Sequence, residues 1–354
     1  METKTVKPRY EYVDLMKGVC IILVVIQHLV GQCAVNPPWL TTFRMPLYFM
    51  LSGLFFSTYG SLRTFLIKKF NSLLVPFFFT WAICWVHIHL HYEHPENFDI
   101  LKYNVAIWFL IALFEVGLLF YFIYQLPKEW MKALVSLLIS ITGYMMHQWN
   151  IHLPLYIDAA MSATIFYYIG PLIRRFHLLE PHSKQTNLTG AAISIFVFGT
   201  LAYYYPSSLL DLRLNRIFTP YPVFLLSAVS GTAAVFFICK LIRHIPLISY
   251  WGRYSIITLC SHIFIYHLLN EYGALELIRK VLNIDPKLWL EWKLGPWIGV
   301  VSVFFLTLPL TWLLIRHIPF LCSQMPLLDP KSGKLYKSPR TLLRIFIKGK
   351  RADD

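Results

Sequence analysis

Two titratable residues, Lys17 and His28, lie within one long apolar stretch near the start of the chain. Eleven residues of α-helix make three turns plus about 20° and rise about 16 Å, so both side chains lie on one helical face. Asp14 lies almost one turn before Lys17 on nearly the same face. A histidine can take and return a proton near neutral pH, and a lysine can bind an anionic group. The spacing therefore predicts proton chemistry at one end of a helix and anion binding at the other.

The same residues could serve structure alone. A lysine near a helix end can extend its ammonium group to the membrane surface, and a buried histidine can hydrogen-bond a neighbouring helix. That interpretation suffices for either residue separately. Asp14, Lys17 and His28 share one face, however, and Gly18 beside them permits close approach of another helix. A charged group inside a bilayer is costly unless it faces protein or water, so the aligned set favours a functional interior face.

The composition indicates a protein embedded in a membrane. Of the 354 residues, 57% are hydrophobic and 14% are charged, and the mean hydropathy is +0.55. Soluble domains are closer to half apolar and a quarter charged. Apolar stretches of about 20 residues, the length that crosses a bilayer as a helix, recur along the chain. Ten such segments are expected, near residues 13–33, 40–59, 72–91, 105–125, 131–147, 153–172, 188–206, 220–241, 250–270 and 295–316.

The distribution of basic residues predicts the orientation. With the N-terminus in the cytoplasm, most of the 32 lysines and arginines fall in inner segments, as the positive-inside rule requires. We therefore expect an all-α, polytopic integral membrane helical bundle with about ten transmembrane helices, N-in/C-in, in the cell membrane (inner or plasma membrane). Its expected parts are a cytoplasmic N-terminus (1–12), a transmembrane domain (13–316) and a basic cytoplasmic tail (317–354).

The net charge of +14 follows largely from this topology. The basic tail also suits attraction to the anionic lipids of an inner leaflet. Binding of nucleic acid is not expected, because no basic soluble module is present to carry it. The six cysteines form no CxxC pair, so neither disulfides nor a metal site is expected.

Six motifs occur in an order that is typical of one family. They are YVDLMKGVCIILVVIQH (12–28), FRMPLYFMLSG (43–53), KKFNSLLVP (68–76), WFLIALF (108–114), FYYIG (166–170) and WGRYSIITLCSH (251–262). Together they resemble the membrane acyltransferase-3 family, ten-helix enzymes that acylate surface glycans and lipids, over residues 9–316. The family signature of a basic residue, ten residues and a histidine matches Lys17 and His28. Two positions depart: Arg44 stands where the family often has histidine, and Ser72 replaces the second residue of a basic pair that begins at Lys69.

The resemblance implies an integral-membrane O-acyltransferase that modifies a polysaccharide or lipid-linked sugar. Its co-substrate would be acyl-CoA, acetyl-CoA by default, and no cofactor is bound permanently. The chain has no GxSxG motif or Ser-His-Asp order, so His28 is expected to act as general base for direct attack by an acceptor hydroxyl. Basic residues fall at the inner ends of the expected helices, where they could bind the phosphates of cytoplasmic CoA.

The candidate residues form three groups. The catalytic candidates are His28, Lys17, Asp14, Glu115, Asp158 and His262. The candidates for binding acyl-CoA are Lys17, Arg63, Lys68, Lys69, Ser72 and Arg253, where Lys68 or Arg63 would compensate for Ser72. The candidates for binding the acceptor are Arg44, Trp108 and His147.

Two other functions fit some of the same features. A transporter or flippase for a lipid-linked glycan would also place polar residues inside a helical bundle, but it needs no CoA site. A haem-binding electron carrier could use His28 and His262 as paired ligands, and it would be coloured when purified. The acyl group, the acceptor (capsule, O-antigen, peptidoglycan or lipid-linked sugar), a covalent enzyme intermediate and the oligomeric state are left open by the sequence.

Overall fold

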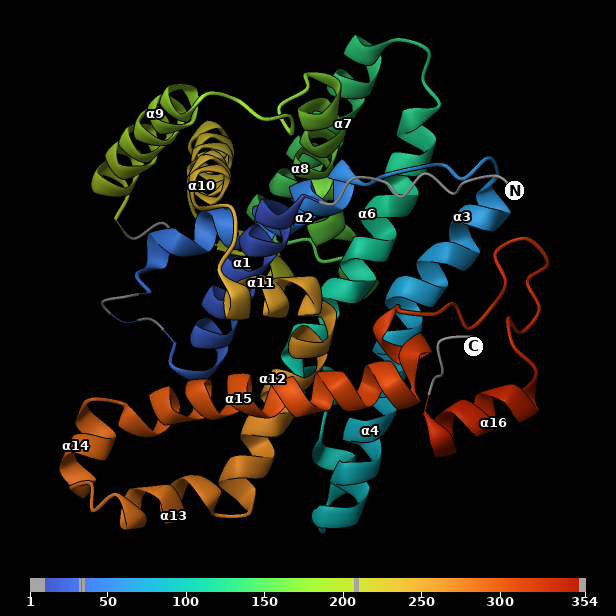
Figure 1. The fold of residues 1–354 in the computed structure, drawn as a ribbon. Helices are drawn as coiled ribbons and strands as arrows, with labels where there is room; N and C mark the ends of the chain where they lie inside the picture. Colours follow the sequence, from blue (N-terminus) through green and yellow to red (C-terminus); the bar gives the residue numbers. More distant parts are fainter. Residues whose placement is uncertain (1–9, 32, 34–35, 207–209, 350–354) are drawn as a thin grey trace.

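The computed structural model describes residues 10–31, 33, 36–206 and 210–349. Apart from one small antiparallel ribbon of β1 (Leu210–Asp211) and β2 (Arg216–Ile217), its regular structure is helical (Figure 1). The α-helices are α1 (Glu11–Leu29), α2 (Thr41–Leu54), α3 (Leu62–Lys69), α4 (Val75–His91), α5 (Ile100–Tyr103), α6 (Trp108–Tyr124), α7 (Glu129–Gln148), α8 (Ile157–Arg175), α9 (Lys184–Tyr204), α10 (Tyr221–Ile242), α11 (Pro246–Arg253), α12 (Ser255–Glu271), α13 (Ala274–Val281), α14 (Pro286–Glu291), α15 (Leu294–His317) and α16 (Pro339–Lys348).

Six helical segments in the described part of the chain are long and apolar enough to cross a membrane. They are Glu11–Leu29, Leu62–His91, Val105–Tyr124, Lys184–Tyr204, Tyr221–Ile242 and Leu294–His317. The protein is therefore a multi-pass membrane protein. The other four expected segments are also helical, as α2, α7, α8 and α12, but do not meet the same requirement of length and apolarity. The number of ten spans and the N-in/C-in orientation stay predictions.

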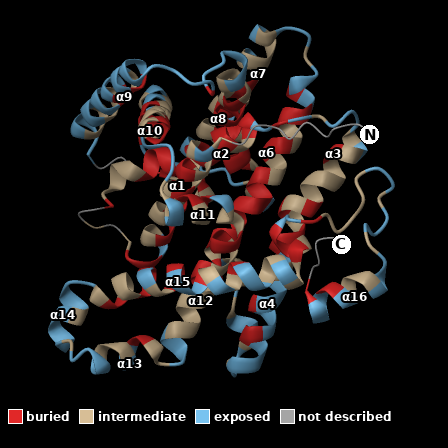
Figure 2. Ribbon diagram, in the orientation of Figure 1, coloured by how far each residue is buried: buried red, intermediate tan, exposed pale blue. Residues whose placement is uncertain are grey.

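Helix α1 lies at the centre of the bundle and packs against α2, α10, α11, α12 and α15. Glu11 and Asp14 lie in its first turn, where acidic groups suit the positive end of the helix dipole. The contact with α11 is made backbone against backbone: a Cβ at Gly18 would overlap the carbonyl oxygen of Ile248, and one at Gly252 would overlap that of Asp14. The predicted close approach at Gly18 is confirmed. Figure 2 shows buried residues concentrated in α1, α2, α6 and α8.

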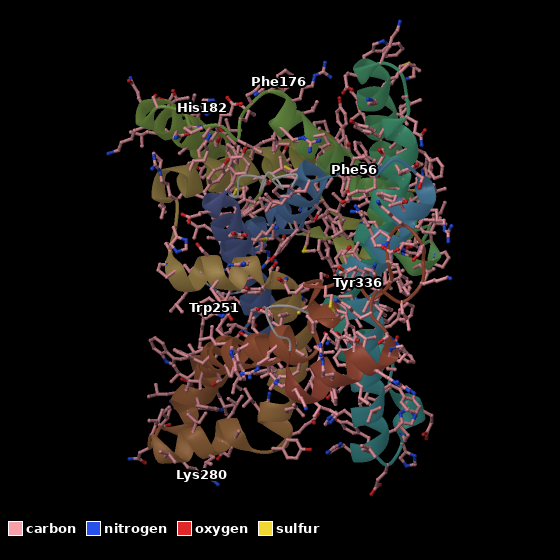
Figure 3. The ribbon with its side chains drawn as sticks, turned by 45° about the vertical axis from the view of Figure 1, so that its right-hand side comes forward. Phe56, Phe176, His182, Trp251, Lys280 and Tyr336 are labelled. Carbon is pink, nitrogen blue, oxygen red and sulfur yellow. The ribbon has the colours of Figure 1, made fainter. Side chains whose placement is uncertain are left out.

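Helices α2 and α8 make a second close pair. Gly53 lies against the backbone of Tyr167, and Gly170 lies against the backbone of α2. Small residues at such positions let two helices approach without side chains between them. Aromatic rings fill the space between α2, α3 and α6, where the ring of Phe56 lies 4.9 Å from that of Phe120 and 5.9 Å from that of Phe65 (Figure 3). This packing fixes the end of α2 relative to α3 and α6.

The segment after α15 folds back onto the junction between α3 and α4. Helix α3 continues into α4 through a π-helical turn, Phe70–Leu74. Within that turn the side chain of Asn71 accepts hydrogen bonds from the backbone N–H groups of Leu327 (3.1 Å) and Leu328 (2.9 Å) and donates one to the carbonyl of Leu328 (2.7 Å). Tyr336 lies farther along this returning segment (Figure 3). The basic end of the chain is thereby attached to the bundle.

Candidate active site

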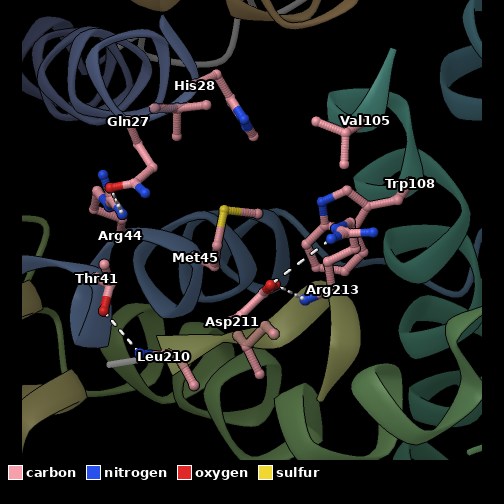
Figure 4. A pocket seen from close by; sticks show the side chains of 12 residues that line it. Gln27, His28, Thr41, Arg44, Met45, Val105, Trp108, Leu210, Asp211 and Arg213 are labelled. Carbon is pink, nitrogen blue, oxygen red and sulfur yellow. Dashed lines mark hydrogen bonds and ion pairs between the residues drawn. The ribbon is translucent and has the colours of Figure 1, made fainter. Parts of the chain in front are cut away.

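A cavity of about 290 Å³ opens where the end of α1 meets the starts of α2 and α6 and the β1–β2 ribbon (Figure 4). Figure 4 shows the imidazole of His28 pointing into the space between Met45, Trp108 and Asp211. Four charged or titratable side chains and one indole share this small space. The lining residues are Val24, Gln27, His28, Thr41, Arg44, Met45, Val105, Trp108, Leu210, Asp211, Leu212 and Arg213.

His28, the penultimate residue of α1, is exposed to this cavity although the surrounding helices enclose it. Its ring lies 5.3 Å from the ring of His262, measured between centroids. His262 is fully buried, and its Nδ1 lies 2.8 Å from the carbonyl oxygen of Thr258. Because a carbonyl only accepts hydrogen bonds, Nδ1 carries the hydrogen, and in the neutral ring Nε2 then presents a lone pair. Among the described residues, none hydrogen-bonds to His262 Nε2.

Arg44 is a buried cation fixed against the end of α1. One of its terminal nitrogens donates to the carbonyl of Leu23 (2.9 Å) and to Oδ1 of Asn36 (3.2 Å), and the other donates to Oε1 of Gln27 (3.2 Å). Asn36 in turn donates to Gln27 (2.8 Å). These bonds use three of the five N–H donors of a guanidinium. Arg44 is thus held rigidly by neutral groups, and its positive charge faces the cavity.

Trp108 begins α6 and forms another wall of the cavity. Its side chain is 5% exposed, and its ring lies 5.6 Å from the ring of Tyr156. His28, Arg44 and Trp108, assigned to two different groups by the sequence analysis, are therefore brought together around one space.

Asp211 and Arg213 were missed by the sequence analysis. Both line the cavity from the ribbon between α9 and α10. The available signal was a pair of opposite charges two residues apart, in a short segment between two expected spans. Nothing in the sequence places that segment against α1 and α6, because its contacts are with residues far away along the chain.

The N-terminal half of α1 carries a different group of residues. Asp14 and Arg253 line a separate cavity of about 230 Å³ between α1 and α11. Lys17 Nζ lies 5.5 Å from the centre of the Phe55 ring on the α2 side, and the Lys17 carbonyl accepts a hydrogen bond from the Tyr48 hydroxyl. Lys17 lies in the first half of α1 and His28 next to its last residue, and of the two only His28 lines the cavity of about 290 Å³.

The remaining candidates for binding acyl-CoA lie along α3 and the π-helical turn Phe70–Leu74. Lys69 Nζ donates to the hydroxyl of Tyr167 (3.3 Å), and Lys68 Nζ lies 3.7 Å above the centre of the Tyr59 ring. Of the six predicted residues, Arg253 alone lines either of the two cavities described above.

The returning segment touches this region. Arg63 donates to the carbonyl of Ser332 (3.0 Å), and the backbone carbonyl of Ser72 accepts from the hydroxyl of Ser323 (2.9 Å). Two of the predicted donor-binding residues therefore contact the folded-back part of the chain.

Three further candidates lie outside the larger cavity. Glu115 lies on α6, and its buried Oε2 has no hydrogen-bond partner among the described residues. Asp158 is buried at the start of α8, with Oδ2 3.4 Å from Nδ1 of His152. His147 ends α7 with its ring 5.6 Å from that of Phe218. None of these three residues lines the cavity that contains His28.

The structure is that of a helical membrane protein with a cavity lined by histidine, arginine and aspartate. The chain belongs to the acyltransferase-3 family: the family's sequence model, described as an acyltransferase domain, matches residues 10–316. The protein is accordingly an acyltransferase, as the six motifs predict. No curated protein and no solved structure shows significant similarity to the chain.

Proposed function

We propose that the protein transfers an acyl group, acetyl by default, from cytoplasmic acyl-CoA to a hydroxyl of an extracytoplasmic glycan or lipid-linked sugar. It would act in the cell membrane and modify polysaccharide by O-acetylation. The observation that carries the proposal is the exposed imidazole of His28 in the cavity that also contains the Arg44 guanidinium. A base for the hydroxyl proton and a cationic hydrogen-bond donor for the oxyanion are the two groups that this reaction needs.

In the proposed reaction, His28 takes the proton of the acceptor hydroxyl while the hydroxyl oxygen attacks the thioester carbon. The new C–O bond converts the carbonyl oxygen into an oxyanion, and Arg44, already fixed by Leu23, Gln27 and Asn36, supplies positive charge there without rearranging. The C–S bond then breaks, and protonated His28 returns its proton to the sulfur. CoA leaves as a thiol, and the acceptor leaves as an ester.

The length of α1 supports transfer across the membrane. With the N-terminus inside, Lys17 lies toward the cytoplasm and His28 about 16 Å nearer the outside. A basic group at the inner end would attract the phosphates of CoA, and the pantetheine arm would carry the thioester to His28. The inner and outer groups thus suit a donor from one side and an acceptor from the other.

The proposal is tested by mass spectrometry of surface glycans from cells with and without the gene, together with acetyl-CoA binding by the purified protein. We expect an acyl group to disappear from one glycan hydroxyl and acetyl-CoA to bind. Unchanged acylation of the glycans, no binding of acetyl-CoA and movement of a lipid-linked glycan by the purified protein would instead identify a flippase.

A further inference from the structure

We propose that the β1–β2 ribbon selects the acceptor, with Asp211 and Arg213 binding neighbouring hydroxyls of a neutral pyranose whose apolar face lies on Trp108. This inference rests on the proposed function, because it assigns the acceptor class of the same cavity.

The ribbon is a rigid part of the site although it lies between two long helices. The backbone N–H of Leu210 donates to Thr41 Oγ1 on α2 (2.8 Å). Asn215 turns the chain at φ 49°, a left-handed conformation that asparagine adopts more readily than most residues. Its side chain donates to the carbonyl of Gly143 on α7 (2.8 Å) and accepts from Ser162 on α8 (2.7 Å). Three helices therefore fix the ribbon before any acceptor binds.

The charged pair on the ribbon retains hydrogen-bonding capacity toward the cavity. Asp211 Oδ1 accepts from the backbone N–H groups of Arg213 (3.1 Å) and Leu214 (3.4 Å), which fixes the carboxylate. The other oxygen, Oδ2, lies 3.8 Å from Nη2 of Arg213, beyond hydrogen-bonding distance. The side chains are 37% and 26% exposed. A hydroxyl donating to Oδ2 and a neighbouring hydroxyl accepting from Arg213 would satisfy both groups.

The other walls favour a sugar ring over an ion or an extended chain. Trp108 lines the cavity, and the small exposed part of its indole can contact C–H groups of a pyranose. The volume of about 290 Å³ lies at the lower limit of the 300–1,000 Å³ typical of small-molecule pockets, so about one ring fits. Arg44 hydrogen-bonds neutral groups, and in the proposed reaction its positive charge stabilises the oxyanion. It therefore needs no negative charge on the acceptor.

The test compares Arg213→Ala and Asp211→Asn with Arg216→Ala in purified, reconstituted protein. Asn keeps an oxygen that can accept from the Arg213 and Leu214 N–H groups, so the ribbon should fold. Arg216 is the matched control, because it lies on the same ribbon, is exposed and does not line the cavity. The probes are acetyl-CoA with the methyl pyranosides of glucose, galactose and mannose and their monodeoxy analogues.

We expect KM for the accepted pyranoside to rise about 10- to 100-fold in Arg213→Ala and Asp211→Asn, with KM for acetyl-CoA unchanged. Arg216→Ala should match the wild type. For the wild type, one monodeoxy analogue should have a higher KM than the parent pyranoside. In Arg213→Ala the two KM values should be equal, which is the sign of a direct contact between Arg213 and the missing hydroxyl.

Equal effects of the Arg213 and Arg216 substitutions, or a rise in KM for acetyl-CoA only, would overturn the assignment of the ribbon. So would transfer to extracted surface glycan without transfer to any pyranoside. Lack of acyl transfer from acetyl-CoA to every acceptor, glycan included, would instead contradict the proposed function.

Discussion

The imidazole rings of His28 and His262 face one another at 5.3 Å, with their planes inclined by 42°. The two residues come from different helices, and their surroundings differ. His28 meets the cavity, whereas His262 is enclosed and held in one tautomer by the carbonyl of Thr258. His262 Nε2 has no hydrogen-bond partner among the described residues, and Asp211 shares the cavity with His28. We therefore expect His262 to act as a positioning residue for the proposed base, by accepting a hydrogen bond from His28 once His28 has taken a proton.

Replacing His262 by Phe should keep an aromatic ring in place but remove the lone pair. We expect kcat to fall about 10- to 100-fold, the size of a lost hydrogen bond to a charged group, with little change in KM. His262→Gln, which restores an accepting oxygen, should recover part of the rate. Steady-state kinetics on both variants provide the measurement. Equal activity of the Phe and Gln variants at unchanged thermal stability would mean that His262 only fills space.

Replacing His28 by Ala should lower acyl transfer by at least about 100-fold, the low end for loss of acid–base catalysis. The protein should still express and fold, because the His28 side chain projects into a cavity and fills no part of the core. His89→Ala, which removes an exposed histidine on α4, provides the control and should behave as wild type. Wild-type turnover by folded His28→Ala would reject the assignment of the base.

Lys69 should bind the donor. Its ammonium group donates to the Tyr167 hydroxyl inside the bundle. Because Lys69 is predicted from the sequence to bind the phosphates of the donor, we expect Lys69→Ala to weaken acyl-CoA binding more than acceptor binding. Because salt screens contacts between lysine and phosphate, affinity for acyl-CoA should also become less dependent on ionic strength in the variant. Calorimetric titration at two salt concentrations measures both effects. Lys184→Ala, at an exposed residue at the start of α9, is the control, and an identical response of the two variants would place the phosphates elsewhere.

The junction of α1 and α11 should tolerate no added methyl group. Gly252→Ala would force a Cβ into the carbonyl oxygen of Asp14, and we expect the free energy of unfolding to fall by about 1–3 kcal/mol. Gly199→Ala on α9 is the matched change, since nothing lies within 4 Å of its Cβ position. That variant should gain up to about 1 kcal/mol from helix propensity. Thermal unfolding in detergent compares them, and equal melting temperatures would contradict the observed packing.

The acyl donor and the acceptor should reach the protein from opposite sides of the membrane. Oriented proteoliposomes given acyl-CoA on the face of the chain's N-terminus and an impermeant acceptor on the opposite face are expected to form ester. No ester should form when donor and acceptor share either side. Labelled acetyl-CoA and scintillation counting of the acceptor give the result. Transfer only with both substrates on the cytoplasmic side would reject the through-membrane route while preserving the acyltransferase assignment.

Features governed by local geometry could be predicted from the sequence. The positions of Lys17 and His28 at opposite ends of one helical face follow from helical rise and twist, and Gly18 correctly predicted a close helix contact. The assembly of the cavity could not be predicted in the same way. Asp211 reaches it on a ribbon held by contacts such as the bond from Leu210 to Thr41, 169 residues away along the chain. Such long-range contacts leave no periodic pattern.

The arrangement of the predicted donor-binding residues also could not be predicted from the sequence. Expected depth at an inner helix end assigned Arg253 to this site, whereas Ser72 was included because it stands at the second position of the family's basic pair, and Arg63 because it would compensate for Ser72. Depth does not specify neighbours, however. Arg253 ends α11 and lines a cavity with Asp14, while Arg63 and Ser72 contact Ser332 and Ser323 of the returning segment. The charge pattern predicts how deep a residue lies in the membrane. Which residues surround it depends on how the helices pack.

The bond between Asn71 and Leu328 has a consequence for synthesis of the protein. The two residues are separated by 257 positions, so the ribosome has to add most of the chain before the amide of Asn71 meets its partners. At about 5–20 residues per second, this takes roughly 13 to 51 seconds after Asn71 itself is made. During that interval a polar amide at the α3–α4 junction must be satisfied by water, lipid headgroups or the insertion machinery. A nascent chain that terminates early would keep this amide unpaired, which would distinguish it chemically from the finished protein.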